Sequence, residues 1–118
     1  MLKVIVAGGR EFKDYDLLCR EMINFLRGKY PKDVEIVSGT ARGADKLGER
    51  FAEEKGCRVA YFPAEWDLYG KSAGYRRNAK MAKYADAAVC FWDGKSRGTK
   101  HMIDLAEKEV LQVKVIKY

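Results

Sequence analysis

The stretch Val34-Glu35-Ile36-Val37-Ser38-Gly39-Thr40-Ala41-Arg42-Gly43-Ala44-Asp45 decides the fold of this chain. It begins with a mostly apolar run typical of a strand and leads into the apolar spacing of a helix. A strand, a glycine-rich turn and a helix form the anion pocket of parallel α/β sheets. Glycines let the backbone approach a ligand closely, and the helix N-terminus offers unpaired N–H groups. The stretch therefore predicts a parallel sheet that binds a phosphate-like group.

A second turn of the same kind lies near the C-terminal end of the chain. It reads Asp93-Gly94-Lys95-Ser96-Arg97-Gly98-Thr99, and it also follows an apolar run and precedes a helical pattern. Its lysine and arginine flank the glycines, so their charge is aimed where a phosphate would lie. Two such turns indicate a nucleotide-like ligand.

Strand and helix patterns alternate along the whole chain. Apolar stripes with helical spacing fill the gaps between five short runs, Asp14 is a plausible N-cap, and Gly56 is a plausible C-cap. The alternation predicts an α/β fold: a single Rossmann-like three-layer domain over residues 1–118, with a five-stranded, mostly parallel sheet and helices on both faces. The expected strands are Lys3–Ala7, Val34–Val37, Arg58–Phe62, Ala87–Phe91 and Gln112–Ile116.

Composition excludes several classes of protein. The 118 residues carry a net charge of +6, which favours anionic partners without separating nucleotides from nucleic acid. Three scattered cysteines and one histidine predict free thiols, no metal site and no disulfide framework. No apolar run reaches membrane-spanning length. We therefore expect a cytoplasmic protein with no membrane contact and no resident cofactor.

Four loops follow strands and should meet at one edge of the sheet, where open α/β sheets bind ligands. They comprise Gly8–Arg10, Ser38–Asp45, the long connection from Phe62 to Gly74, and Trp92–Thr99. Asn78, on the helical pattern after the third loop, is added to them. The candidate ligand-binding residues are Gly8, Gly9, Arg10, Ser38, Gly39, Thr40, Arg42, Gly43, Asp45, Trp66, Asn78, Trp92, Gly94, Lys95, Ser96, Arg97, Gly98 and Thr99.

Several of these residues allow two interpretations. Arg10 can grip a phosphate with two parallel hydrogen bonds, or its loop can be a plain turn. Asp45 can complement the helix dipole or accept hydrogen bonds from a ribose. Of the two tryptophans, Trp66 and Trp92, at least one is expected to pack and the other can stack on a base. The Walker and dinucleotide signatures are both missing.

A resemblance to a known family is carried by five segments: Val4–Arg10, Val37–Leu47, Phe62–Trp66, Arg77–Met81 with the Ala85-Asp86-Ala87 that follows it, and Phe91–Asp104. Together they resemble the YspA-like branch of the SLOG superfamily. That superfamily also includes the DNA-processing DprA/Smf proteins and the lonely-guy, lysine-decarboxylase-like enzymes. The resemblance covers nearly the whole chain and implies a Rossmann-like fold with a nucleotide ligand.

The resemblance also implies an enzymatic alternative. Lonely-guy enzymes cleave the base from a nucleoside 5′-monophosphate with the arginine of an Arg-Lys-x-x-Met motif and a glutamate that follows a glycine-rich motif. Arg77 matches that arginine, since Met81 follows four residues later, but Met102 occupies the position of the glutamate. A thioether cannot act as a base, so Glu65 or Asp93 would have to replace it. The candidate catalytic residues are Arg77, Glu65 and Asp93.

The sequence leaves three functions open. The first is a module that binds a nucleotide or nucleotide-derived small molecule as a sensor or carrier. The second is a nucleoside-monophosphate N-glycosidase that uses Arg77 and a loop carboxylate. The third, nucleic-acid binding, is possible but not favoured because the positive charge is dispersed along the chain. The resemblance further implies a homo-oligomer.

Overall fold

Five strands form one fully parallel sheet in the computed structural model, which describes residues 1–118. The sheet order is β3-β2-β1-β4-β5, and every neighbouring pair is parallel, where the sequence predicted a mostly parallel sheet. The strands are β1 (Leu2–Gly8), β2 (Val34–Ser38), β3 (Arg58–Tyr61), β4 (Ala87–Trp92) and β5 (Gln112–Lys117). Each begins and ends within one residue of its predicted bounds.

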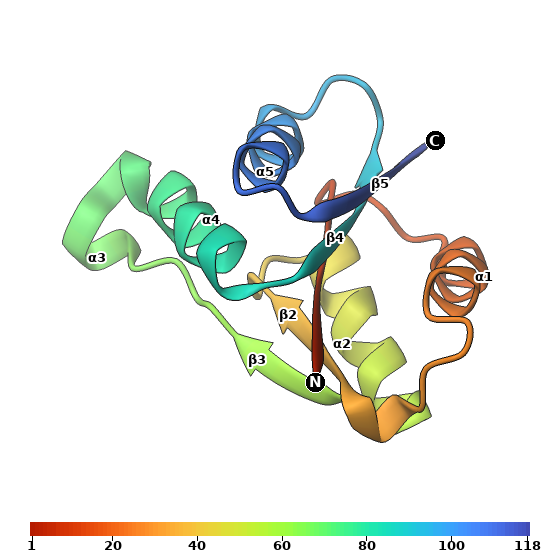
Figure 1. The fold of residues 1–118 in the computed structure, drawn as a ribbon. Coiled ribbons are helices and arrows are strands. Elements are labelled where there is room, and N and C mark those ends of the chain that lie inside the picture. Colours follow the sequence, from red (N-terminus) through yellow and green to blue (C-terminus); the bar gives the residue numbers. More distant parts are fainter.

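Helices cover both faces of the sheet, which confirms the predicted three-layer Rossmann-like fold. Figure 1 shows α1 and α2 on one face and α4 and α5 on the other. The helices are α1 (Tyr15–Phe25), α2 (Ala44–Lys55), α3 (Trp66–Tyr69), α4 (Ala73–Tyr84) and α5 (Arg97–Lys108), and short 3₁₀ turns span Pro31–Asp33 and Gly70–Ser72.

The core has two halves because alternate residues of β1 point to opposite faces of the sheet. Val4 and Val6 pack toward α1 and α2, whereas Ile5 and Ala7 pack toward α4 and α5. β1 and β4 are buried on both faces, which explains why their sequences are continuously apolar rather than alternating.

The predicted helix ends are largely confirmed. The Asp14 side chain accepts a hydrogen bond from the Leu17 amide at 3.0 Å, and Gly56 ends α2 in the left-handed conformation. At α5 the cap is Ser96, which precedes the helix and whose hydroxyl accepts from the Thr99 amide at 3.4 Å. The predicted long loop after β3 contains α3 and the second 3₁₀ turn.

Gly43 holds the first two loops of the sheet edge together. Its φ angle is +85°, and a Cβ atom placed on it would lie 2.7 Å from the Arg10 carbonyl carbon and would also overlap the Gly9 oxygen. The Ala44 amide donates to the same Gly9 oxygen at 3.3 Å. Only glycine therefore allows α2 to begin directly against the loop that follows β1.

We expect Gly43→Ala to destabilise the fold by more than left-handed strain alone. Gly56→Ala is the comparison, because Gly56 is left-handed with a φ of +82° and a ψ of 25° and has no atom within 4 Å of its would-be Cβ, whereas Gly43 combines the close contact with a ψ of −129°. Gly56→Ala should cost about 1–2 kcal/mol, and Gly43→Ala at least about 2 kcal/mol more, since backbone atoms must move. Urea unfolding measures both free energies, and equal losses would contradict the close contact.

Candidate ligand-binding site

A cavity of about 390 Å³, called the main cavity below, opens at the carboxyl ends of β1 and β4. The strand order reverses between these two strands, so the loops that follow them diverge to opposite faces and leave a crevice. Three of the four predicted loops contribute to it: the first, the second and the fourth. Neighbouring strand and helix residues, α4 and the last residue complete the wall. The lining residues are Ala7, Gly8, Gly9, Arg10, Glu11, Ala41, Asp45, Arg77, Asn78, Met81, Asp93, Ser96, Gly98, Thr99, Met102 and Tyr118.

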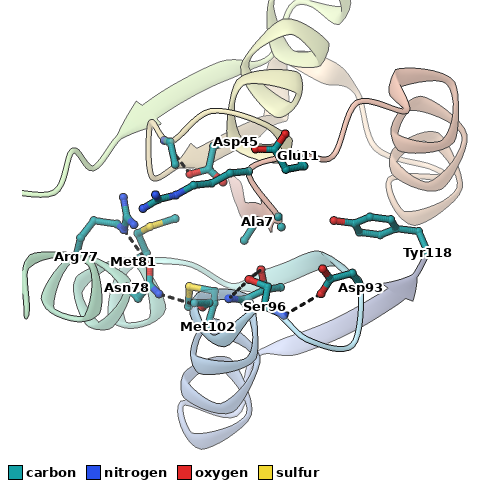
Figure 2. Close-up of a pocket in the computed structure, with 16 residues that line it drawn as sticks. Ala7, Glu11, Asp45, Arg77, Asn78, Met81, Asp93, Ser96, Met102 and Tyr118 are labelled. Carbon is teal, nitrogen blue, oxygen red and sulfur yellow. Dashed lines mark hydrogen bonds between the residues drawn. The ribbon is translucent and has the colours of Figure 1, made fainter. Parts of the chain in front are cut away.

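The side chains of this cavity converge from distant parts of the sequence. Figure 2 shows Ala7 at the centre, with Asp45 on one side and Asn78, Ser96 and Tyr118 around it. These residues belong to β1, α2, α4, the β4–α5 loop and the segment after β5. The crevice therefore forms only when β1, β4 and the helices beside them have come together.

Arg77 is half-buried and firmly positioned. Its Nη1 donates to the Gly39 carbonyl oxygen, and its Nε donates to the Asn78 side-chain oxygen at 2.9 Å. Burial lowers the pKa of Arg77, nearby Asp45 opposes this shift, and the positive charge of Arg10 adds to it. The two guanidinium groups thus lie close enough to repel each other, and an anion between them would relieve that repulsion.

Asp45 is a buried carboxylate in the first turn of α2, with 7% of its surface exposed. Its Oδ2 accepts from the Ala41 amide at 3.1 Å, while no protein group donates to Oδ1. Burial raises the pKa of Asp45 to about 6, against the opposing effects of the Ala41 hydrogen bond and the Arg77 charge. The carboxyl group can therefore exchange a proton near neutral pH and has one oxygen free for a ligand.

The start of α5 forms the opposite wall. The buried side chain of Asn78 donates from Nδ2 to the Gly98 carbonyl at 3.4 Å and lies 3.3 Å from His101 Nδ1, which ties α4 to α5. A Cβ atom on Gly98 would meet nothing within 4 Å, so this position faces open space in the cavity. Its N–H belongs to the first turn, whose amides have no acceptor within the helix.

A second cavity of about 440 Å³ adjoins the first on the β2 side. It contains the half-exposed ring of Trp66, and Arg10, Ala41 and Arg77 line both cavities. The other lining residues are Gly39, Thr40, Arg42, Pro63 and Ala64. Arg42 pairs with Glu11 at 2.5 Å at the rim.

Most of the candidate ligand-binding residues line one of these two cavities, and a smaller group does not. Ser38 is fully buried and its hydroxyl donates to Glu49 at 2.6 Å, so it supports the loop from below. The Trp92 indole donates to the Ser96 carbonyl at 3.1 Å and packs rather than stacks. Trp92, Lys95 and Arg97 border a separate hollow. Gly43 and Gly94 line neither of the two cavities and shape their turns, Gly94 with a φ of +85°.

The three candidate catalytic residues are not brought together. Arg77 and Asp93 both line the main cavity. Glu65 lies in a different hollow, which Arg77 also borders, and there Lys80 pairs with Glu65 at 3.6 Å. Asp93 Oδ1 accepts from the Ser96 and Lys95 amides at 2.8 Å each, and these hydrogen bonds lower its pKa. The carboxylate beside Arg77 is instead that of Asp45.

Sequence reasoning missed six residues of the main cavity. Ala7 carries only the apolar signal of a core, Met81 entered only as the methionine that aligns Arg77 with the family motif, and Tyr118 follows the last strand without any motif. Met102, which the resemblance placed at the glutamate position, does line the cavity, so that position faces the crevice with a thioether. The remaining two are Glu11 and Ala41.

The chain belongs to the family described as the YspA, cpYpsA-related SLOG family, whose model matches residues 2–69. It is also 33% identical over 119 residues to the Gene 61 protein of Mycobacterium phage D29. That alignment covers 96% of this chain and 94% of the phage protein. The predicted family membership is confirmed.

Two solved structures of DNA processing protein A share the fold. The Streptococcus pneumoniae protein superposes with a TM-score of 0.72 and 18% identity over 100% of this chain, which spans 51% of that protein. The Helicobacter pylori protein, described for its single-stranded DNA binding mode, gives a TM-score of 0.69 and 20% identity over 99% of this chain and 66% of that protein. At these identities the likeness establishes a Rossmann-like fold.

Two further observations bear on the site. None of the helices has the length and apolar character needed to cross a bilayer. No group of three or more His, Cys, Asp or Glu side chains is arranged to hold a metal ion.

Asp45 should make stability depend on pH in a defined direction. Its pKa is higher in the folded chain, about 6, than the ordinary 3.8, so folding takes up a proton between these values and stability falls as pH rises through them. Urea unfolding of wild type and Asp45→Asn should therefore agree below about pH 4 and diverge in favour of Asn above pH 6. The largest expected difference is about 3 kcal/mol. Parallel pH curves would contradict the buried carboxylate.

Proposed function

We propose that this protein binds a nucleotide or nucleotide-derived small molecule in the main cavity, as a sensor or carrier module. The observation that carries the proposal is the pair Arg10 and Arg77, which present two guanidinium groups to one crevice at the strand-order reversal. Arg10 forms no ion pair with any acidic side chain. A phosphate between the two arginines would supply the missing negative charge.

The neighbouring groups suit the rest of a nucleotide. Gly98 brings a first-turn amide to the cavity wall, where a phosphate oxygen can accept from it. The free Oδ1 of Asp45 can accept hydrogen bonds from ribose hydroxyls. The volume of about 390 Å³ lies at the lower end of the range for small-molecule sites, about 300–1,000 Å³.

Binding of AMP tests this proposal. Arg10→Gln and Gly98→Val should each weaken AMP binding at least about tenfold, the first by removing a charged hydrogen-bond donor and the second by filling the cavity. Isothermal titration calorimetry measures the affinities, and unfolding without ligand confirms that the variants are folded. Arg20→Gln, which removes an exposed arginine of α1 away from both cavities, is the matched control. Unchanged affinity in both cavity variants would contradict the site.

Nucleotide N-glycosidase activity is a second candidate, favoured by Asp45. A carboxyl group with a pKa of about 6 beside Arg77 can remain protonated in the cavity and act as a general acid. It would protonate the departing base as the C1′–N bond breaks, and a water molecule would form the C1′–O bond. The proton lost by that water would return to Asp45, and the products would be the free base and ribose 5-phosphate.

This candidate predicts that the protein releases adenine from AMP. Chromatography measures the free adenine. Asp45→Asn should slow the release at least about 100-fold while AMP still binds, and the wild-type rate should fall above about pH 6 as the acid ionises. Asp67→Asn on α3 removes an exposed carboxylate outside both cavities and should leave the rate unchanged. AMP binding without any adenine release would leave the protein a binding module.

Nucleic-acid binding is a third candidate. It draws on the shared fold with DNA processing protein A, for which single-stranded DNA binding is described in the Helicobacter pylori structure. A net charge of +6 fits such a partner as well as it fits a nucleotide. We keep as further proposals that residues 1–118 form a single domain, that the protein self-associates, and that it acts in the cytoplasm.

A further inference from the structure

The two cavities at the edge of the sheet share a wall that contains two arginines. Arg10, Ala41 and Arg77 line both, so the two arginines lie at the junction between the cavities. A phosphate bound there would lie in the middle of the combined site. Its substituents could then extend in two directions.

The charge at this junction is not balanced by the protein. Arg10 makes no ion pair, and Glu11, the acidic residue next to it, pairs with Arg42 at 2.5 Å. Asp45 is the remaining acidic group near Arg77, and its carboxyl is half-neutral near pH 6. The two guanidinium groups therefore favour a phosphate at the junction.

The two cavities differ in what they offer beyond the junction. The first has hydrogen-bonding groups, chiefly the free Oδ1 of Asp45 and the amide of Gly98. The second has Pro63, Ala64 and the ring of Trp66, which is 51% exposed. An exposed indole beside small apolar residues is a surface on which a planar base can stack. A mononucleotide held in the first cavity would leave that surface uncovered.

From this arrangement we infer that the ligand is two-armed: two nucleoside-like halves joined through phosphate, with the phosphate between Arg10 and Arg77 and one half in each cavity. The inference rests on the proposed nucleotide-binding function and names the class of ligand. Asp45 recognises the sugar of the first half, and Trp66 stacks on the base of the second. A small ligand of this kind suits two adjoining hollows that meet at a pair of arginines, whereas a polynucleotide would need a continuous basic track.

Calorimetric titration with ADP and with diadenosine pyrophosphate tests the inference. The two probes share one adenosine and the pyrophosphate, and the second probe adds another adenosine in place of a terminal oxygen. We expect diadenosine pyrophosphate to bind wild type at least about tenfold more tightly than ADP, the size of effect that one stacked base gives. Trp66→Ala should remove that preference and leave the ADP affinity within about twofold. Tyr30→Ala, which truncates an exposed aromatic far from both cavities, should change neither value.

The possible failures are distinguishable. Equal affinity of wild type for ADP and diadenosine pyrophosphate overturns the two-armed ligand but leaves nucleotide binding in place. An equal loss for both probes in Trp66→Ala also overturns it, since Trp66 would then not be specific to a second arm. An oligothymidylate that binds more tightly than diadenosine pyrophosphate, with dependence on Trp66, overturns it in favour of single-stranded DNA. If the folded protein binds neither probe, the proposed function fails together with the inference.

Discussion

The guanidinium group of Arg77 connects the two helical layers of this protein across the carboxyl edge of the sheet. It projects from α4 on one face, donates to the Gly39 carbonyl after β2, and lies near Asp45 of α2 on the other face. The side chain thereby fixes the distance between two walls of the crevice. Its charge also acts on Asp45: burial raises the pKa of that carboxyl, and the Ala41 hydrogen bond and the Arg77 charge oppose the rise.

The two glycine-rich turns both lead from a strand into a helix, but different contacts hold them in place. At α2, Gly43 brings the helix against the backbone of Gly9, so contact between loops defines the edge. At α5, Ser96 caps the helix and Asp93 holds the turn through backbone hydrogen bonds, which leaves Gly98 facing open space. The first turn is thus mainly architectural, and the second leaves an amide available to a ligand.

The fold could be predicted well because each of its signals is local. Continuous apolar runs marked β1 and β4, and the spacing of Asp14 and Gly56 marked helix ends. The site could be predicted in part, since glycine loops after strands must meet at one edge. What the sequence could not supply was side-chain direction. The backbone turns Glu65 toward Lys80 and buries Asp45 beside Arg77, and no local pattern distinguishes these two carboxylates.

β1 lies at the centre of the sheet, so the crevice cannot form until β1 has paired with β4, which lies far along the sequence. β1 is the first strand in the sequence, yet the Lys3 amide donates to Asp86 at 2.9 Å and the Asp86 amide donates back to the Lys3 carbonyl at 2.8 Å. Parallel pairing across so long a separation carries a large loop-closure entropy and is expected to form late in folding. Because the cavity lies between β1 and β4, a ligand there binds only chains that have completed this pairing. A bound ligand would therefore raise the free energy of unfolding of the whole domain, and not only stabilise the loops that it contacts.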